Sequence, residues 1–238
     1  MKSKTDQTTI IIVGSMHLAP DEYPEYRQWL TKIIEEIAPN IICAELSPEQ
    51  LAGTQTCNSK PEQRDIVMPT ARRLGIPIVP IQLPTPIAIE WDNQYKALEN
   101  EVRMNETSCA VLDFCNMLAH KEADLWRIRM KSASCIEHYQ YEDYHVFCEA
   151  RDEANAILFP ELAKPYNEWN EYFLEQIEHT IKDNPGSRIM VIAGLWQNTG
   201  FGIDWKAGAM LPFTTLSRIV KNTENSNNIK AQEHHAAH

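Results

Sequence analysis

The chain has 238 residues, of which 43% are hydrophobic and 23% are charged. This composition is typical of a globular protein with a sizeable core, and it excludes collagen-like, coiled-coil and disulfide-framework proteins. The 33 acidic and 22 basic residues give a formal net charge of −11. That charge disfavours binding to nucleic acid or to an anionic membrane surface, because both need clustered Lys and Arg. We therefore expect no nucleic-acid partner and no membrane partner.

The sequence shows neither a membrane span nor a signal peptide. No run reaches the roughly 18–20 apolar residues that a span requires. The first apolar run, residues 10–13, is too short for the core of a signal peptide. The six cysteines are scattered without a CxxC pair, which favours reduced thiols. We expect a cytoplasmic protein.

The first 44 residues predict a strand, a helix and a second strand. Residues 8–13 are a short β-branched run, typical of a buried parallel strand. Residues 24–37 place apolar side chains at helical spacing, and residues 41–44 are again apolar. This order indicates a βαβ unit. We expect the two strands to be neighbours, which would bring together the residues that follow them, His17 and Glu45.

The remaining pattern continues the alternation of helix and strand. Residues 61–74 predict a helix that Gly75 ends, and residues 76–81 predict a strand whose prolines indicate a sheet edge. Residues 87–183 predict an almost wholly helical block. Residues 187–193 predict another buried strand.

These elements predict an α/β fold: a largely parallel central sheet flanked by helices, with a helical insertion before the last core strand. We expect one domain over residues 1–221, with the insertion at about 87–183. Residues 222–238 are polar and predict a disordered tail.

In such sheets the ligand site lies outside the carboxyl ends of the strands. That rule indicates three loops, at residues 14–17, 45–51 and 194–200. His17, in the first loop, has the chemistry of a metal ligand or general base, although a loop histidine can also simply hydrogen-bond. Glu45 ends a buried apolar strand, so its carboxylate needs a cation, a metal or a proton beside it.

Four short motifs, in order, resemble the TraB/PrgY/Tiki family, which belongs to a wider group with the erythromycin esterases and ChaN-like haem-binding proteins. Residues 14–17 (GSMH) and 39–48 (PNIICAELSP) resemble the opening of that family. Residues 71–78 (ARRLGIPI) resemble its entry into a later strand. Residues 151–156 (RDEANA) are similar to its helical motif. The resemblance spans about residues 8–203.

The resemblance implies a hydrolase that acts on a peptide or ester bond. In the family, the final strand leads into a second GxxHxxG motif, whose histidine joins the first in a proposed metal site. The matching stretch here, residues 194–200, carries Gln197 at the histidine position. A glutamine oxygen is a much weaker ligand for a transition metal than imidazole. The resemblance thus allows for a divalent Mn, Co or Zn ion on His17 and Glu45, with one strong ligand missing.

The same resemblance implies a role for each candidate residue. His17 would be a metal ligand or the general base that activates water, and Glu45 would hold the metal or orient that histidine. Arg151 would stabilise developing negative charge, although a surface salt bridge explains an arginine there equally well. Substrate binding is assigned to Gly14, Trp196, Gln197 and Gly200.

Two further interpretations stay open. A chain that lacks the second histidine would retain the cleft for binding alone, as a non-catalytic, signal-sequestering protein. A helix face between residues 135 and 152 carries His138 and His145, which could bind haem or a metal, although a solvated polar face is the simpler interpretation. The expected partner is a peptide or small-molecule substrate. The sequence leaves open whether the chain forms a homo-oligomer.

Overall fold

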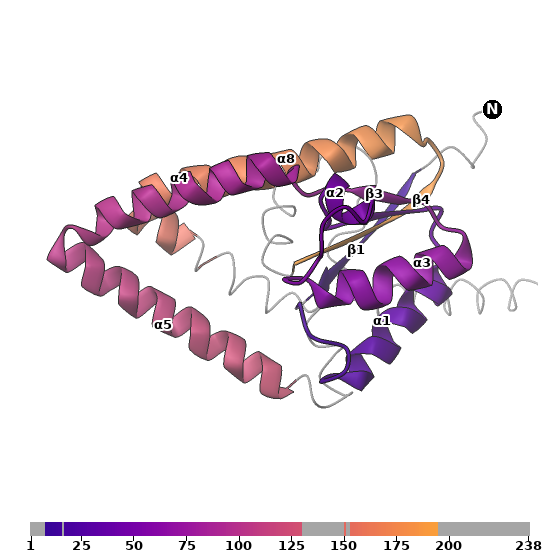
Figure 1. Cartoon of the computed structure of the whole chain (residues 1–238), viewed down its shortest axis with the longest axis horizontal. Helices are drawn as coiled ribbons and strands as arrows, with labels where there is room; N and C mark the ends of the chain where they lie inside the picture. The colour runs from indigo at the N-terminus through magenta and orange to yellow at the C-terminus, as the bar shows by residue number, and fades with distance from the viewer. Residues whose placement is uncertain (1–7, 16, 130–149, 151–152, 195–238) are drawn as a thin grey trace, which may run out of the picture.

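The computed structural model describes residues 8–15, 17–129, 150 and 153–194. Its centre is a four-stranded sheet in which every strand is parallel to its neighbours. The strands follow the order β1-β4-β2-β3 (Figure 1). Their bounds are Thr9–Ser15 for β1, Ile41–Ala44 for β2, Ile78–Pro80 for β3 and Arg188–Gly194 for β4. The predicted α/β class is confirmed.

The expectation that β1 and β2 are neighbours is wrong, because β4 lies between them. All of β4 except its first residue, Arg188, is buried. A strand of this kind needs a neighbour on each side to pair its backbone, and β1 and β2 supply them. Ser15 is registered against Gly194, and the Glu45 N–H donates to the Ile192 carbonyl at 3.1 Å. The carboxyl ends of β1, β4 and β2 therefore lie side by side at one end of the sheet.

One face of the sheet is covered by α1 (Pro24–Ile37) and α3 (Met68–Leu74). The buried side chains of α1 recur at helical spacing and pack on Ile42, Met190 and Ile192 of the sheet. A π-helix, η1 (Gln63–Val67), precedes α3 in the same layer. The sequence predicted one continuous helix here, and the π-turn is the departure from it.

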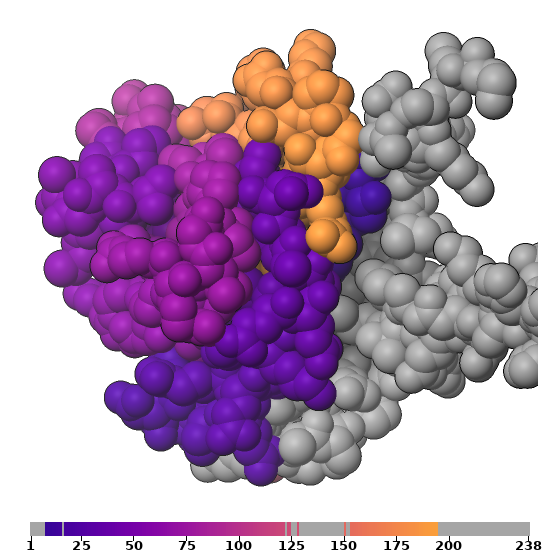
Figure 2. Space-filling model, turned by 90° about the vertical axis from the view of Figure 1, so that its right-hand side faces the viewer, coloured from indigo at the N-terminus to yellow at the C-terminus, as the bar shows by residue number. Residues whose placement is uncertain are grey.

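The other face is covered by α8 (Pro160–Asp183). Phe173 and Ile177 of α8 pack against Cys43 and Val191, whose side chains point away from the α1 layer because side chains alternate along a strand. Figure 2 shows the orange surface of α8 and β4 at the top and the indigo to violet surface of the N-terminal segment at the bottom. The fold thus has three layers, with the sheet in the middle.

The helical insertion forms an arm, which we define as α4 (Thr85–Arg103) and α5 (Glu106–Arg129). Helix α4 lies beside α8, where the rings of Trp91 and Trp169 meet edge to face at 4.5 Å. Helix α5 packs on α4 near the turn between them and then diverges, which gives the arm its open V shape (Figure 1). The predicted helical block is confirmed over the described part of residues 87–183.

Several smaller predictions also meet the structure. Gly75 has a φ of 68°, in the left-handed region that glycine adopts at little cost, and it ends α3 as expected. Strand β3 is shorter than residues 76–81 and lies at the sheet edge, as its prolines indicated. Across the described residues, no helix combines the length and apolar character needed to cross a membrane. The predicted tail, residues 222–238, lies outside the described residues.

Candidate functional site

His17 lies two residues beyond the end of β1, in a backbone conformation that residues other than glycine rarely adopt. Its φ is 52°, in the left-handed region, which is costly for a residue with a Cβ and is concentrated at functional sites. Its side chain is 32% exposed, in contrast to its two carboxylate neighbours, Glu45 and Glu62, at 2% and 0%. The imidazole is therefore the part of this group that solvent reaches.

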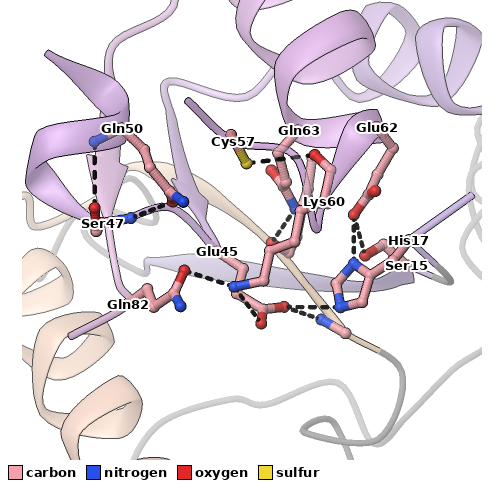
Figure 3. Close-up of polar contacts among 12 residues, drawn as sticks. Ser15, His17, Glu45, Ser47, Gln50, Cys57, Lys60, Glu62, Gln63 and Gln82 are labelled. Carbon is pink, nitrogen blue, oxygen red and sulfur yellow. Dashed lines mark hydrogen bonds and ion pairs between the residues drawn. The ribbon is translucent and has the colours of Figure 1, made fainter. Parts of the chain in front are cut away.

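Glu62 binds the Nδ1 edge of the His17 ring. Its Oε1 lies 2.8 Å from His17 Nδ1 and also accepts a hydrogen bond from the Ser15 hydroxyl at 2.8 Å (Figure 3). Because an ionised carboxylate only accepts, this contact favours the tautomer that carries its proton on Nδ1. The other ring nitrogen, Nε2, is then the basic one.

Glu45 occupies the carboxyl end of β2 and is held from three sides. Its Oε1 lies 2.9 Å from the Lys60 ammonium, its Oε2 accepts from the Gly194 N–H, and Oε2 also lies 3.8 Å from His17 Nε2. The Lys60 ammonium donates as well to Gln82 Oε1, beyond the end of β3. Glu45 was expected to need a cation, a metal or a proton beside it, and the structure supplies the Lys60 ammonium.

The opposite charges in this group control its protonation. Burial lowers the pKa of His17, but the Glu45 and Glu62 carboxylates outweigh burial and raise the pKa above its ordinary value of 6.5. Burial raises the pKa of Glu45, but Lys60 and His17 outweigh it and hold the pKa below its ordinary value of 4.5. Glu45 is therefore ionised at neutral pH, and His17 takes up a proton more readily than a free imidazole.

The π-helix η1 begins directly after Lys60 and Glu62. The Lys60 carbonyl accepts from the Gln63 and Arg64 N–H groups, and the Gln63 side chain donates to the Ile192 carbonyl at 3.1 Å. Glu62 Oε2 and Gln63 Oε1 are buried and have no hydrogen-bond partner among the described residues. Single π-turns are frequent at functional sites. Here the side chains of Lys60, Glu62 and Gln63, at the start of the turn, reach the carboxyl ends of the strands.

We call His17, Glu45, Lys60 and Glu62 the charge cluster. Sequence reasoning found the first two and missed the other two. A lysine and a glutamate around the first turn of a helix are ordinarily solvated, so nothing in residues 60–62 marks them as buried. Ser15 was named only as part of the GSMH motif, although its hydroxyl contacts Glu62.

The other predicted site residues are placed only in part. Gly14 lies within β1 and is registered against Ala193 of β4. Arg151, Trp196, Gln197 and Gly200 lie outside the described residues. The same holds for the polar face that carries His138 and His145.

The donors that the structure brings together fit a divalent metal poorly. The Glu45 carboxylate is engaged by Lys60 and by the Gly194 N–H. The contact between His17 Nδ1 and Glu62 leaves Nε2 available as a donor. An ammonium 2.9 Å from Glu45 Oε1 repels a second cation at the same carboxylate. Within the described ranges, no group of three or more His, Cys, Asp or Glu side chains is arranged to hold a metal ion.

Comparisons with known proteins add no assignment. No family model matches the chain, and no curated protein or solved structure matches it either. The resemblance to the TraB/PrgY/Tiki family therefore stays a prediction from four short motifs.

Proposed function

We propose that the protein is a hydrolase of an ester or peptide bond in which His17 acts as the general base on water. The observation that carries this proposal is the contact between His17 Nδ1 and the buried Glu62 carboxylate, at 2.8 Å. A histidine held at Nδ1 by a carboxylate keeps Nε2 free to take a proton, and the carboxylate stabilises the imidazolium that results. The strained φ of His17 adds support, because such strain persists where a side chain must be aimed.

The chemistry needs one water and one proton carrier. Nε2 of His17 takes a proton from water while the water oxygen attacks the carbonyl carbon of the substrate. The bond from that carbon to the leaving oxygen or nitrogen then breaks, and the imidazolium returns the proton to the leaving group. The products are an acid and an alcohol or amine, and His17 ends neutral. Glu62 keeps its position at Nδ1 throughout.

The remaining assignments belong to the same proposal. Glu45, fixed by Lys60 and 3.8 Å from Nε2, would help to stabilise the imidazolium. Arg151 stays the candidate for the negative charge that develops on the carbonyl oxygen. Substrate contacts are proposed for Gly14, Trp196, Gln197 and Gly200. A peptide or small molecule in the cytoplasm is the proposed substrate.

The test is hydrolysis of a panel of p-nitrophenyl esters and fluorogenic peptides. We expect His17→Ala to fall to the uncatalysed rate and Glu62→Gln to lose at least about 100-fold in kcat, the contribution typical of a general base. The matched control is Lys32→Ala, which removes an exposed ion pair on α1 and should leave kcat unchanged. Dialysis against EDTA should also leave the rate unchanged.

Other outcomes would change the assignment. A rate that EDTA abolishes and Mn²⁺, Co²⁺ or Zn²⁺ restores would return the metal to the site, despite the Lys60 ammonium at Glu45. Saturable binding of peptides without any product would favour the non-catalytic, signal-sequestering alternative. Turnover that is unchanged in His17→Ala would overturn the proposal.

A further inference from the structure

We propose that Lys60 is the built-in cation of this site: a positioning residue whose ammonium does for Glu45 what a bound metal ion would do. The catalytic part of this inference rests on the proposed function, but the cation site itself does not. Figure 3 shows the lysine side chain reaching down to Glu45 and Gln82, with its nitrogen between their side-chain oxygens.

The acceptors and the cation come from different parts of the chain. Glu45 follows β2, and Gln82 follows β3, the next strand in the sheet. Their Oε1 atoms lie 2.9 Å and 2.5 Å from Lys60 Nζ. The sheet therefore builds a cation pocket, and the cation arrives on a side chain from the segment before η1.

The backbone on each side of the pocket is fixed independently of the lysine side chain. The Ala44 and Leu46 carbonyls accept from the Ile81 and Gln82 N–H groups, so the two acceptor residues stay side by side without Lys60. The Lys60 carbonyl is fixed by the turn that opens η1. Truncation of the lysine side chain should therefore leave Glu45 and Gln82 in place and open a cavity where the side chain lay.

The occupant of that space is defined by chemistry. The lysine side chain is only 8% exposed and Glu45 is 2% exposed, so the pocket is buried and a charge in it must be compensated. The contacts favour a primary ammonium, since Nζ donates to a carboxylate and to an amide oxygen at once. A free alkylammonium ion of the right length should replace the lysine side chain.

Chemical rescue tests the inference. Lys60→Ala removes three carbons and the nitrogen, which are the heavy atoms of n-propylammonium. We expect n-propylammonium to raise the Tm of Lys60→Ala saturably, by about 2–4 °C at roughly five times its Kd. Propan-1-ol, which has the same shape and no charge, should raise it much less. Where the enzyme turns over, the ammonium should also recover kcat, a readout that general stabilisation would not move.

Two control variants locate the effect. Lys60→Ala combined with Glu45→Gln removes the carboxylate, so the response to n-propylammonium should disappear. Lys32→Ala loses an exposed lysine, 71% exposed and 3.5 Å from Glu36, and should show no response at all. An equal response to amine and alcohol, or no response to the amine in Lys60→Ala, would overturn the inference.

The experiment stays informative if Lys60→Ala does not fold unaided. The readout is then the yield on refolding from urea: recovery with n-propylammonium but not with propan-1-ol supports the site, and equal yields contradict it. Failure of this inference is distinguishable from failure of the proposed function. Rescue of Tm without any turnover supports the cation site and contradicts the hydrolase proposal. Turnover without rescue supports the hydrolase proposal and contradicts the cation site.

Discussion

The ion pairs of the charge cluster and those of the arm have different surroundings. In the charge cluster, Lys60 and Glu45 are 8% and 2% exposed and lie where three strands end. In the arm, Lys96 and Asp92 form an i,i+4 pair on α4 and are 64% and 51% exposed. The first pair is buried in the packed interior, and the second is solvated and screened by salt.

Apolar side chains show the same contrast between buried positions at the sheet and exposed positions in the arm. The sheet buries most of the apolar residues it carries, on both faces, and the others are half-buried. Helix α5 leaves Phe114, Met117 and Leu118 about half exposed on one side. The same residue type should therefore contribute more to the free energy of unfolding in the sheet and its two covering layers than in the arm.

The largest expected effect is in the core. Phe173 is fully buried between α8 and the sheet, whereas Phe114 on α5 is 56% exposed. We expect Phe173→Ala to lower the free energy of unfolding by about 3–5 kcal/mol and Phe114→Ala to change it by less than about 0.5 kcal/mol. Urea denaturation monitored by circular dichroism measures both. Equal losses would show that the arm is as tightly packed as the sheet.

A loss of similar or slightly smaller size is expected in the charge cluster. Lys60→Met leaves the Glu45 carboxylate buried without its cation, which should cost about 3–5 kcal/mol in the free energy of unfolding. Combining Lys60→Met with Glu45→Gln removes the uncompensated charge and should recover most of the loss. The same urea titrations give the answer. A double variant no more stable than Lys60→Met would mean that the lysine acts through packing alone.

The pH dependence of stability should be smaller and should have a defined window. The raised pKa of His17 means that its contribution is full below pH 6.5 and is lost as pH rises through the higher folded value. The lowered pKa of Glu45 means that its contribution is full above pH 4.5 and is lost as pH falls through the lower folded value. The Tm difference between the wild type and His17→Gln should therefore shrink above pH 6.5.

Activity should move in the opposite direction to this stability. The general base must be neutral, so kcat should rise as pH increases through the raised pKa of His17. A pH–rate profile measured beside the Tm profile tests both together. An acid limb at or below pH 6.5 would contradict the proposed environment of the histidine.

The smallest effect is expected in the arm. Lys96→Ala breaks the exposed pair with Asp92 and should change the free energy of unfolding by less than about 0.5 kcal/mol. Differential scanning calorimetry in low and high salt would detect a change. A loss of stability as large as that expected for Lys60→Met would show that the exposed ion pair of the arm contributes as much as the buried pair of the charge cluster.

Prediction from the sequence succeeded where the signal is local. Helix α1 was predicted at its observed bounds, because the spacing of its apolar residues and the Pro at its start act within one element. Gly75 was placed correctly for the same reason. His17 and Glu45 could be selected because each follows a short apolar run, and the ends of parallel strands share one edge.

The sequence by itself determined the α/β class, the apolar strands and two members of the charge cluster. Only the tertiary structure decided that β4 separates β1 from β2, because strand order depends on which edge a distant segment fills. It also decided that Lys60 and Glu62 are buried beside Glu45 and His17. Those charges gain their partners from segments that are remote in sequence, and burial of a lysine or glutamate depends on the partner rather than on its own neighbours.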